Sequence, residues 1–476
     1  MPSIQEIAGY VAAGAPFLIA ALALLVLRWP ATRAGGAALA AALGGALLCP
    51  ALTAAGLGEA AWSGLGTAAN VLYVLFGGLL LFNVLSRTGA VDRVSEFLGR
   101  LEPDRGALAL VVVVGAAPFF ESVTGFGVAV VISAPVLLAA GFSRVRTAAL
   151  ASWGQCAVPW GALGVGTVVG ADLAGLQFGE LSDASALLNL PLFPVYGLAA
   201  VMMAGGFSGL RRNGAEAAGL GLAAGAGTLL TSLYLVPELA GAAGGLVAVA
   251  AFLLPRRSRL RELPLPRRSL APYGLLLALL VSASGVPPVE RALEGLGPAF
   301  SGPAIWLFVS AAFAALLLGL KRAEATSALG DTLRQWLPVA GAVLAFVLAG
   351  QIMAASGAAA LLAGGAAAAL GGLYPAFGPA VGALGGALTG SNAASNALFM
   401  PFQAEAARAG DASLLTLAAL QNVAGSHASM LAPQRVVLAA AAVGMAGREA
   451  EIVRSIAPPV LVSLAVLTVV GAASLV

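Results

Sequence analysis

Long apolar runs follow one another along the chain, with only short polar connections between them. The first three extend from Tyr10 to Leu27, from Ala34 to Ala55 and from Leu65 to Leu85, and similar runs recur as far as Leu475. Each run is near the ~20 residues that an α-helix needs to cross a bilayer. The pattern therefore predicts an all-α membrane protein with about twelve transmembrane helices and no separate soluble domain.

Composition agrees with this pattern. The chain is 60% hydrophobic and 9% charged, whereas a soluble domain carries about 25% charged residues. The run Tyr10 to Leu27 lies between Glu6 and Arg28 and lacks the basic start of a signal peptide, so we expect this helix to be retained. Cys49 and Cys156 both lie in apolar runs, where cysteine behaves as a small hydrophobic residue. No disulfide, metal site or cofactor is expected.

Basic residues are confined to the connections between the apolar runs. They give a net charge of +3, but they form no helical stripe or nucleic-acid-binding motif, so no nucleic-acid partner is expected. Cytoplasmic loops of membrane proteins carry an excess of Lys and Arg. With both termini outside, the following clusters fall inside: Arg28 and Arg33, Arg87 to Arg105, Arg144 and Arg146, Arg211 and Arg212, Arg256 to Arg268, and Lys321 and Arg322. Arg291 and Arg408 fall in outer loops.

Two apolar segments are predicted to be re-entrant helical hairpins. Basic residues flank segment 106–142 on both sides, so both of its ends are expected on the cytoplasmic side. A second hairpin is expected over 375–405. Non-helical backbone at membrane depth is tolerated only where it is buried in protein or lines a cavity. Four stretches rich in Gly, Pro and polar residues are candidates for such backbone: the hairpin tips Pro118–Gly127 and Leu388–Asn396, and the helix breaks Gln155–Gly161 and Gln421–Ser429.

The second half of the chain aligns with the first. Thr147-Ala-Ala-Leu lines up with Thr416-Leu-Ala-Ala, and the same offset brings Ser122 onto Ser391. We predict a first repeat over 1–212 (five spans and a hairpin), two linking spans and a basic cytoplasmic loop over 213–268, and a second repeat over 269–476 with the same contents. An odd number of spans turns the copies upside down, as in alternating-access transporters. Chance similarity between Ala/Gly-rich helices is the alternative.

Three ionisable residues lie well inside apolar segments, where an unpaired charge is costly and a function is the default hypothesis. Glu121 is a candidate proton carrier; alternatively, its carboxylate ties the hairpin tip to backbone N–H groups. His427, the only histidine of the chain, is a second proton-coupling candidate or a packed neutral side chain. The Arg435 guanidinium is a candidate for binding a carboxylate through two hydrogen bonds; alternatively, the side chain extends to the cytoplasmic interface.

Uncharged polar residues concentrate at the same four stretches. The free N–H groups of a half-helix suit a carboxylate, so a small anion is the expected ligand. Hydrogen bonding between helices is the alternative role for such residues. Together with Arg435, the candidate substrate-binding residues are Ser122, Thr124, Gly125, Gly127, Gln155, Ser391, Asn392, Ser395, Asn396, Gln421, Asn422 and Ser426.

Two blocks of sequence resemble the bacterial L-lactate permease family. Glu121-Ser-Val-Thr-Gly-Phe-Gly is similar to the hairpin motif Glu-x-x-x-Gly-Phe-Gly of that family, and Gly390-Ser-Asn-Ala-Ala-Ser-Asn-Ala-Leu-Phe is followed by Met430-Leu-Ala-Pro-Gln and Gly447-Arg-Glu. The resemblance implies a proton-coupled symporter of small monocarboxylates such as L-lactate or glycolate, in a bacterial inner membrane.

The chain departs from the family pattern at two positions. Asn392 stands where the family has an acidic residue, and Ser429 stands where it has a lysine. One charge of each sign is lost together, which leaves the net charge of the site unchanged. His427 and Arg435 are available for replacement chemistry.

Three other functions fit the sequence less well. A channel lacks support because no repeated filter sequence or charged pore ring is evident. An intramembrane enzyme would need a nucleophile with a base, paired carboxylates or a metal cluster, which one histidine and two scattered cysteines do not suggest, so no enzymatic activity is expected. A sodium-coupled carrier of another small organic anion is the closest alternative, because Ser, Thr and Asn oxygens also coordinate Na⁺. Membrane lipid surrounds the protein in each case, and a homodimer is suggested by analogy alone.

Overall fold

Every regular element in the described part of the chain is a helix. The computed structural model describes residues 4–47, 52–295, 300, 302–410 and 412–474. Among these residues, eight helices are long and apolar enough to cross a membrane, or nine if one bent pair counts as a single span. The prediction of an all-α chain with many apolar spans is confirmed, whereas about twelve spans is more than this set contains.

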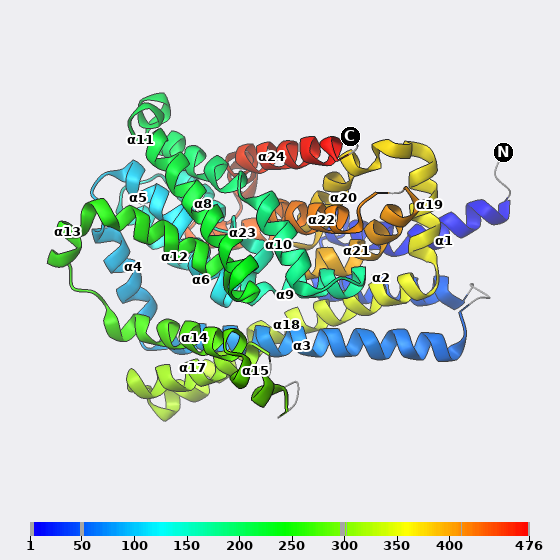
Figure 1. The fold of residues 1–476 in the computed structure, drawn as a ribbon, viewed down its shortest axis with the longest axis horizontal. Coiled ribbons are helices and arrows are strands. Elements are labelled where there is room, and N and C mark those ends of the chain that lie inside the picture. Colours follow the sequence, from blue (N-terminus) through cyan, green and yellow to red (C-terminus); the bar gives the residue numbers. More distant parts are fainter. Residues whose placement is uncertain (1–3, 48–51, 296–299, 301, 411, 475–476) are drawn as a thin grey trace.

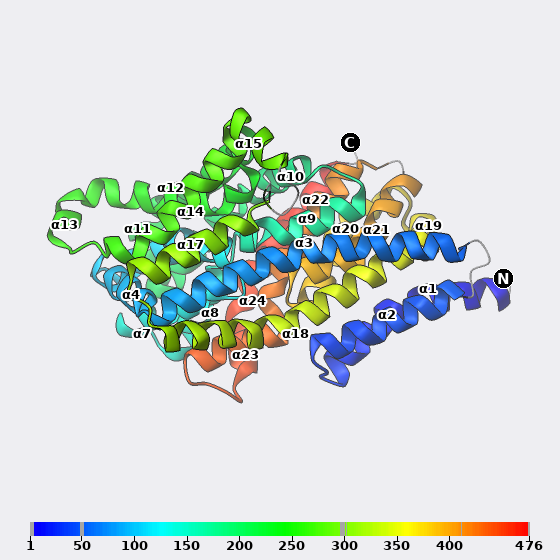
Figure 2. The same ribbon diagram turned by 90° about the horizontal axis from the view of Figure 1, so that it is seen from below.

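Two 34-residue helices, packed antiparallel, extend along the molecule (Figure 2): α3 (Ala54–Arg87) and α18 (Arg322–Ala355). Near the end of α3, Arg87 Nε donates to Asp331 Oδ2 near the start of α18 at 3.1 Å. Near the opposite ends, Gln351 Nε2 lies 3.4 Å from Ser63 Oγ. Beside this pair lie α1 (Ile4–Ala21), η1 (Leu22–Val26), α2 (Ala31–Leu47), α14 (Arg267–Gly285), α15 (Pro287–Glu294) and α17 (Ala304–Leu317).

Each half of the chain contains a pair of helices joined by a tight turn at the expected hairpin. The first comprises α5 (Arg105–Val111), η2 (Val112–Ala116), α6 (Ala117–Thr124) and α7 (Val128–Ala139), and the second comprises α20 (Tyr374–Thr389) and α21 (Asn392–Ala409). The turns are shorter than predicted, because helix α6 continues to Thr124. Positive φ angles at Gly125 (71°), Phe126 (58°), Gly127 (79°) and Gly390 (61°) reverse the backbone there.

Each hairpin is followed by a helix that is interrupted before it continues. In the first half these elements are α8 (Arg144–Trp153), η3 (Val158–Trp160) and α9 (Gly161–Ala174), with a bend of 63°. In the second half they are α22 (Leu414–Ala428), η7 (Ser429–Leu431) and α23 (Pro433–Ala442). The predicted break at Gln421–Ser429 is therefore wrong: most of it is helix α22. The side chains of Gln421, Asn422 and His427 are hydrogen-bonded to neighbouring helices, and the break comes only before Pro433, which lacks an N–H group.

The remaining helices cover these segments. They are α4 (Ala90–Arg100), α10 (Phe178–Asn189), α11 (Leu192–Tyr234), η4 (Pro237–Leu239), α12 (Ala240–Leu253), η5 (Leu254–Arg256), α13 (Arg257–Glu262), α19 (Ala358–Leu370), η6 (Gly371–Leu373) and α24 (Glu449–Ala473). Helix α11 reverses direction at Gly206, whose φ is 61°. Its two arms touch, since a Cβ on Gly209 would lie 2.7 Å from Val201 O.

The order of elements is similar in the two halves. Helices α3 and α18 are each followed by a glycine with positive φ, Gly89 or Gly357, then by a short helix, a hairpin and an interrupted helix. The proposed match of Ser122 with Ser391 does not fit this order. Ser122 lies within α6 before the first turn, whereas Ser391 caps α21 after the second turn.

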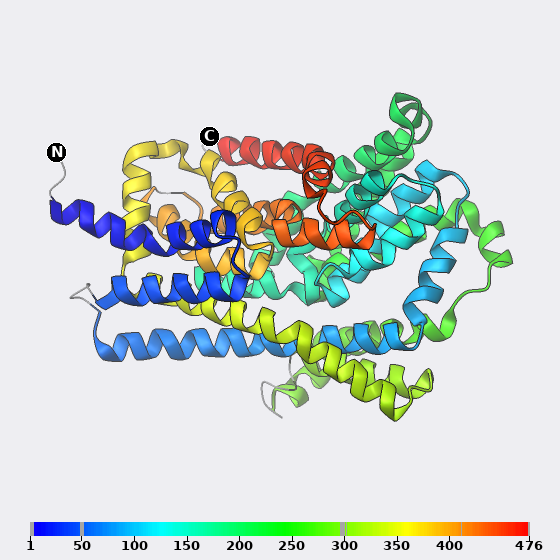
Figure 3. The ribbon, with the colours of Figure 1, turned by 180° about the vertical axis from the view of Figure 1, so that it is seen from behind.

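Basic connections gather at one end of the long axis. Figure 1 shows α13, α4 and the reversal of α11 toward one end and the start of α1 toward the other, with the end of α24 between the middle and that second end. The turn between α1 and α2 differs, since Figures 2 and 3 show it near the middle of the axis. Arg28 and Arg33, which flank that turn, are therefore separated from the other basic clusters.

Candidate functional site

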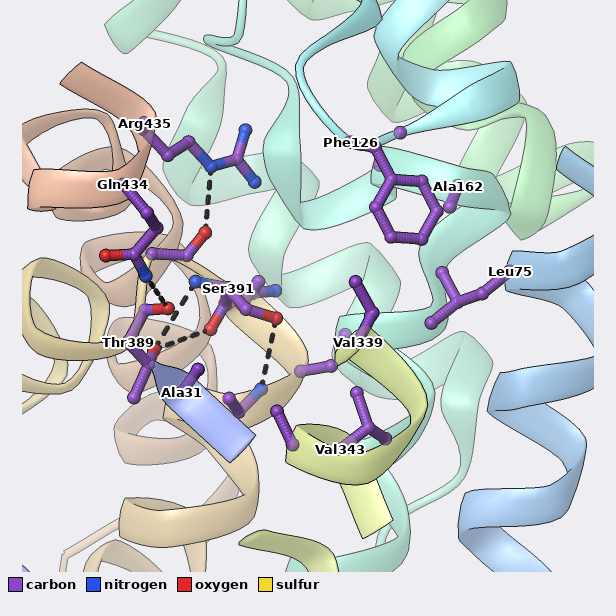
Figure 4. A pocket seen from close by; sticks show the side chains of 18 of the residues that line it. Ala31, Leu75, Phe126, Ala162, Val339, Val343, Thr389, Ser391, Gln434 and Arg435 are labelled. Atoms are coloured by element: carbon purple, nitrogen blue, oxygen red, sulfur yellow. Dashed lines mark hydrogen bonds between the residues drawn. The ribbon is translucent and has the colours of Figure 1, made fainter. Parts of the chain in front are cut away.

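A cavity of about 300 Å³ lies where the two hairpin tips, the first break and the long helices meet. Its walls come from segments far apart in the chain, including the first turn at Gly125, the second turn at Gly390, helix α23 and helix α18. Figure 4 shows polar side chains of the second hairpin and α23 on one side and apolar side chains on the other. Both predicted hairpin tips and the first predicted break contribute to its lining, whereas no residue of the second predicted break, Gln421–Ser429, does.

Glu121 and Arg435 form an ion pair in the wall of the cavity. Arg435 Nη1 lies 3.2 Å from Glu121 Oε1, and the side chains are 14% and 1% exposed, respectively. Glu121 also accepts hydrogen bonds from the backbone N–H groups of Gly127 (3.1 Å) and Ala129 (3.2 Å) at the start of α7. The carboxylate thus ties the hairpin tip together, as one of the two interpretations of Glu121 expected. The positive end of the α7 dipole favours a negative charge there.

Arg435 is held by three segments of the fold. Its Nε donates to Gly390 O at 2.8 Å, and its Nη1 donates to Gln155 Oε1 as well as to Glu121. Nη2 has no hydrogen-bond partner among the described residues, and Figure 4 shows the guanidinium extending from α23 toward the cavity. Arg435 therefore points inward and does not extend to an interface.

The first turn of helix α21 faces the same cavity. Residues 391–394 line it, and the Ser391 side chain caps the helix by accepting from Ala394 N at 3.4 Å. Gln434 Nε2 donates to Thr389 O, which fixes α23 against the second turn. An α-helix N-terminus carries a partial positive charge and unpaired N–H groups, which attract anions. This side of the cavity therefore presents a cation and a helix N-terminus together.

The opposite side of the cavity is apolar. It comprises Leu75 on α3, Val339 and Val343 on α18, and Phe126 at the first hairpin tip (Figure 4). Leu75 and Val343 are buried in the main hydrophobic core, 5% and 2% exposed. The packing of α3 against α18 therefore holds this wall in position.

A cluster of asparagines lies behind the α21 turn. The Nδ2 groups of Asn392 and Asn396 both donate to Asn422 Oδ1, at 2.7 and 2.8 Å. Asn422 Nδ2 in turn donates to Thr167 Oγ1 at 3.0 Å and to Ser185 Oγ at 2.9 Å. The buried Oδ1 atoms of Asn392 and Asn396 have no hydrogen-bond partner in the described part of the chain. An unsatisfied buried acceptor is costly, so these two oxygens are candidates for binding a donor or a cation.

Several other predicted residues form hydrogen bonds away from the cavity. Gln421 accepts from Gln403 Nε2 at 3.0 Å and donates to Ser395 Oγ at 3.3 Å. Thr124 Oγ1 donates to Phe120 O at 2.6 Å, one helical turn earlier. None of Gln421, Ser395 and Thr124 lines the cavity. The contacts of Gln421 and Ser395 match the hydrogen bonding between helices that the sequence left open for polar residues, whereas Thr124 bonds within its own helix.

His427 lies outside the cavity lining. Its Nε2 is 2.6 Å from Asn189 Oδ1, and its Nδ1 is 2.7 Å from the Tyr196 hydroxyl. Asn189 Oδ1 can only accept, so Nε2 carries the proton and Nδ1 accepts from Tyr196, as a neutral imidazole does. The Tyr196 ring also stacks on the imidazole at 5.3 Å between centroids. The geometry is that of the packed neutral histidine that the sequence offered as the alternative.

The sequence identified part of the lining and missed part of it. Five candidates line the cavity: Glu121, Gly125, Ser391, Asn392 and Arg435. Three others form hydrogen bonds with these residues: Gly127, Gln155 and Asn422. Asn396 donates to the carbonyl of Gly166, which also lines the cavity. Ser122, Ser426 and His427 are buried elsewhere. Thr389 and Gln434, which lie within or beside the motifs singled out, were missed, and so was the apolar wall, whose residues resemble any other core residue of a membrane helix.

The chain is similar over most of its length to known membrane permeases. The model of the family described as L-lactate permease matches residues 9–258 and 298–476. L-Lactate permease of Escherichia coli (strain K12) is 26% identical, with 81% of this chain and 80% of that protein covered. L-Lactate permease of Streptococcus iniae is 23% identical, with 71% and 77% covered. Glycolate permease of Escherichia coli (strain K12) is 25% identical, with 81% and 80% covered. This chain therefore belongs to the L-lactate permease family.

Proposed function

We propose that this protein is a proton-coupled symporter of small monocarboxylates such as L-lactate or glycolate. The observation that carries the proposal is the Glu121–Arg435 ion pair in the wall of a cavity that the α21 N-terminus also faces. Relatives named for lactate and glycolate transport support the substrate class.

The substrate carboxylate binds between Arg435 and the first turn of α21. Arg435 Nη2 and the N–H groups at the start of α21 are the donors available on this side of the cavity. Guanidinium geometry suits a carboxylate, and a helix N-terminus adds a favourable field. Gly390 lets the backbone turn closely here, since its φ of 61° suits glycine.

Asn392 accepts a hydrogen bond from the 2-hydroxyl group. Its Oδ1 is buried without a partner, and the residue lines the cavity beside Ser391. A hydroxyl donor satisfies an acceptor of this kind, and leaving such an acceptor unpaired costs about 1–3 kcal/mol. Lactate and glycolate both carry that hydroxyl next to the carboxylate. A neutral Asn392, where relatives of this family have an acid, therefore keeps a role in substrate binding.

Glu121 couples the proton to the substrate by competing for Arg435. The empty site is neutral, because one carboxylate pairs with one guanidinium. A second carboxylate would leave an unpaired negative charge in a desolvated site, which is unfavourable. A proton on Glu121 removes that charge and releases Arg435 Nη1 toward the substrate. Proton and anion then enter and leave together, as a symporter requires.

A sodium-coupled carrier is the second candidate. The observation in its favour is the pair of buried, unpartnered Oδ1 atoms of Asn392 and Asn396, beside Asn422 and Thr167. Amide and hydroxyl oxygens are ligands that hard cations accept. In this version Na⁺ takes the place of the proton, and Glu121 keeps a structural role.

For the architecture we propose two inverted repeats, 1–212 and 269–476, with re-entrant hairpins at 106–142 and 375–405 and two linking spans over 213–268. The similar order of elements supports this plan, and so does the antiparallel packing of α3 against α18, which occupy equivalent places in the two halves. The gathering of basic connections at one end supports a cytoplasmic assignment for that end, with both termini outside, in a bacterial inner membrane.

The test is uptake of radiolabelled L-lactate into proteoliposomes with an inward proton gradient, and separately with a sodium gradient. We compare the wild type with Glu121→Gln, using Glu405→Gln as a control because Glu405 pairs with Arg408 away from the cavity. Proton-driven accumulation that Glu121→Gln abolishes supports the proposal. Sodium-driven accumulation supports the second candidate, and proton-driven uptake that survives Glu121→Gln removes the coupling role of Glu121. Absence of uptake under both gradients contradicts lactate as substrate.

A further inference from the structure

The cavity is larger than a three-carbon acid requires. Its volume is about 300 Å³, which lies at the lower end of the ~300–1,000 Å³ range of pockets that hold drug-sized ligands. The share of one water molecule in the liquid is ~30 Å³, so the space corresponds to about ten waters. Lactate or glycolate at the polar side would fill only part of it.

The unfilled part faces apolar side chains. Arg435, Gln434 and Ser391 lie on one side of the cavity, whereas Phe126 and Val343 lie on the opposite side (Figure 4). An acid whose carboxylate binds at the polar side has its substituents directed across the cavity. Water facing an apolar wall lacks hydrogen-bond partners there, so an apolar substituent is the better occupant.

The apolar wall is built into the fold. Leu75 and Val343 are 5% and 2% exposed and belong to the main core. Phe126 is held at the first hairpin tip with a φ of 58°, a conformation that costs energy for a residue with a large side chain. Three segments of the fold thus contribute apolar side chains to one wall opposite the ion pair.

We propose that the site also takes 2-hydroxy monocarboxylates with an apolar chain of several carbons. The carboxylate binds at Arg435 and the chain lies against Leu75, Phe126 and Val339. The proposal rests on the carboxylate-binding role of Arg435 given above, but it concerns the other end of the ligand. We therefore expect the preferred substrate to be larger than lactate.

The expected signature is a rise in affinity with chain length. Each methylene group buried against an apolar wall strengthens binding about fourfold. Affinity should therefore increase from glycolate through lactate and 2-hydroxybutyrate to 2-hydroxyhexanoate, until the chain fills the cavity. A site shaped for lactate alone would show its maximum at the three-carbon acid.

The experiment is calorimetric titration of the purified protein in detergent with this series of acids. Val339→Phe narrows the cavity and should weaken the binding of 2-hydroxyhexanoate at least tenfold, with glycolate changed by less than twofold. Val339→Ala widens the cavity and should move the optimum toward a longer chain. Leu337→Phe is the matched control, because Leu337 lies on the same helix but is 60% exposed and does not line the cavity.

The outcomes separate this inference from the proposed transport activity. An optimum at lactate, or equal effects of Val339→Phe on long and short acids, overturns the inference and leaves lactate transport intact. An optimum at a longer acid, together with lactate uptake, supports both proposals. Rising affinity along the series in a protein that does not transport lactate supports the apolar subsite and contradicts lactate as the substrate. Binding of none of the acids contradicts the subsite.

Discussion

At the scale of single residues, the geometry separates side chains that the sequence treated alike. Glu121, His427 and Arg435 all looked like intramembrane ionisable groups with two roles open. Glu121 and Arg435 meet at 3.2 Å in the cavity wall, whereas both ring nitrogens of His427 are engaged elsewhere. The first two are therefore the residues at which substitution should affect transport directly.

Arg435→Lys should impair transport while keeping the positive charge. A lysine cannot reproduce the simultaneous contacts of Arg435 with Gly390, Glu121 and Gln155, and a hydrogen bond to a charged group is worth about 1.5–3 kcal/mol. We expect the KM for lactate to rise about tenfold to a hundredfold, measured from the concentration dependence of uptake. Arg408→Lys is the control, and equal effects of the two substitutions would contradict a binding role for Arg435.

His427→Ala should lower stability and leave the pH dependence of uptake unchanged. The substitution leaves Asn189 Oδ1 and the Tyr196 hydroxyl without their hydrogen-bond partner in a buried site. Each unsatisfied group lowers the free energy of unfolding by about 1–3 kcal/mol. Thermal unfolding in detergent and the pH profile of proton-driven uptake are the two measurements. A shifted pH profile with an unchanged melting temperature would instead support the proton-coupling role that the sequence suggested for His427.

At the scale of elements, capping residues fix where the hairpins begin. Asp104 caps α5 by accepting from Ala107 N at 2.9 Å, and it also contacts Arg212 (2.5 Å) and Asn213 (3.0 Å) at the start of the second arm of α11. Partial burial opposes the shift, but the hydrogen bonds and the charge of Arg212 lower the pKa of Asp104 below its ordinary value. One carboxylate thus links the start of the first hairpin to the covering helices.

Asp104→Asn should destabilise the protein at neutral pH more than at acidic pH. Because the pKa of Asp104 is lowered by folding, its contribution is present above the ordinary carboxyl pKa of about 4 and is lost as the pH falls below that value. We expect a loss of about 1 kcal/mol at pH 7, measured by thermal unfolding over a pH series. The exposed Asp92→Asn serves as control, and a pH-independent difference would count against this cap.

Prediction from sequence succeeded for the first interrupted helix and was less accurate for the second. Gln155–Gly161 contains Pro159 and Gly161 and directly follows Gly154, so local backbone chemistry already disfavours a continuous helix there. Gln421 and Asn422 looked similar, but Gln403, Thr167 and Ser185 satisfy them across helices. Nothing in the local sequence reveals those partners, because they lie far away along the chain.

At the scale of the whole molecule, the antiparallel pair α3 and α18 lies along the apolar side of the cavity. The pair supplies Leu75, Val339 and Val343 of the apolar wall, to which the first hairpin tip adds Phe126, whereas the second hairpin and α23 supply the polar side chains opposite. The turn between α1 and α2 also reaches the cavity, through Pro30, Ala31 and Thr32. A substrate in the cavity would therefore contact both groups of helices at once.

Orientation in the membrane is tested by labelling single introduced cysteines from one side. Arg211→Cys, at the reversal of α11, should react with an impermeant maleimide only in inverted vesicles, and Glu59→Cys, at the start of α3, only in right-side-out vesicles. Both positions are exposed, and the parent protein needs Cys49 and Cys156 replaced by serine. Labelling of both positions from the same side would contradict the proposed topology.

The length of the apolar runs and the composition alone determined that this chain is a multi-pass helical protein. In lipid, a run of apolar residues long enough to cross the bilayer is stable only as a helix or as part of a closed barrel, and these runs have the length of a helix. Local chemistry also determined the hairpin tips, since Gly125, Gly127 and Gly390 allow backbone conformations that other residues resist. The tertiary structure alone decided which polar residues form the site. Glu121 and Arg435 are separated by most of the chain, and only the packing of α23 against α7 and against the second hairpin turn places both in the wall of one cavity.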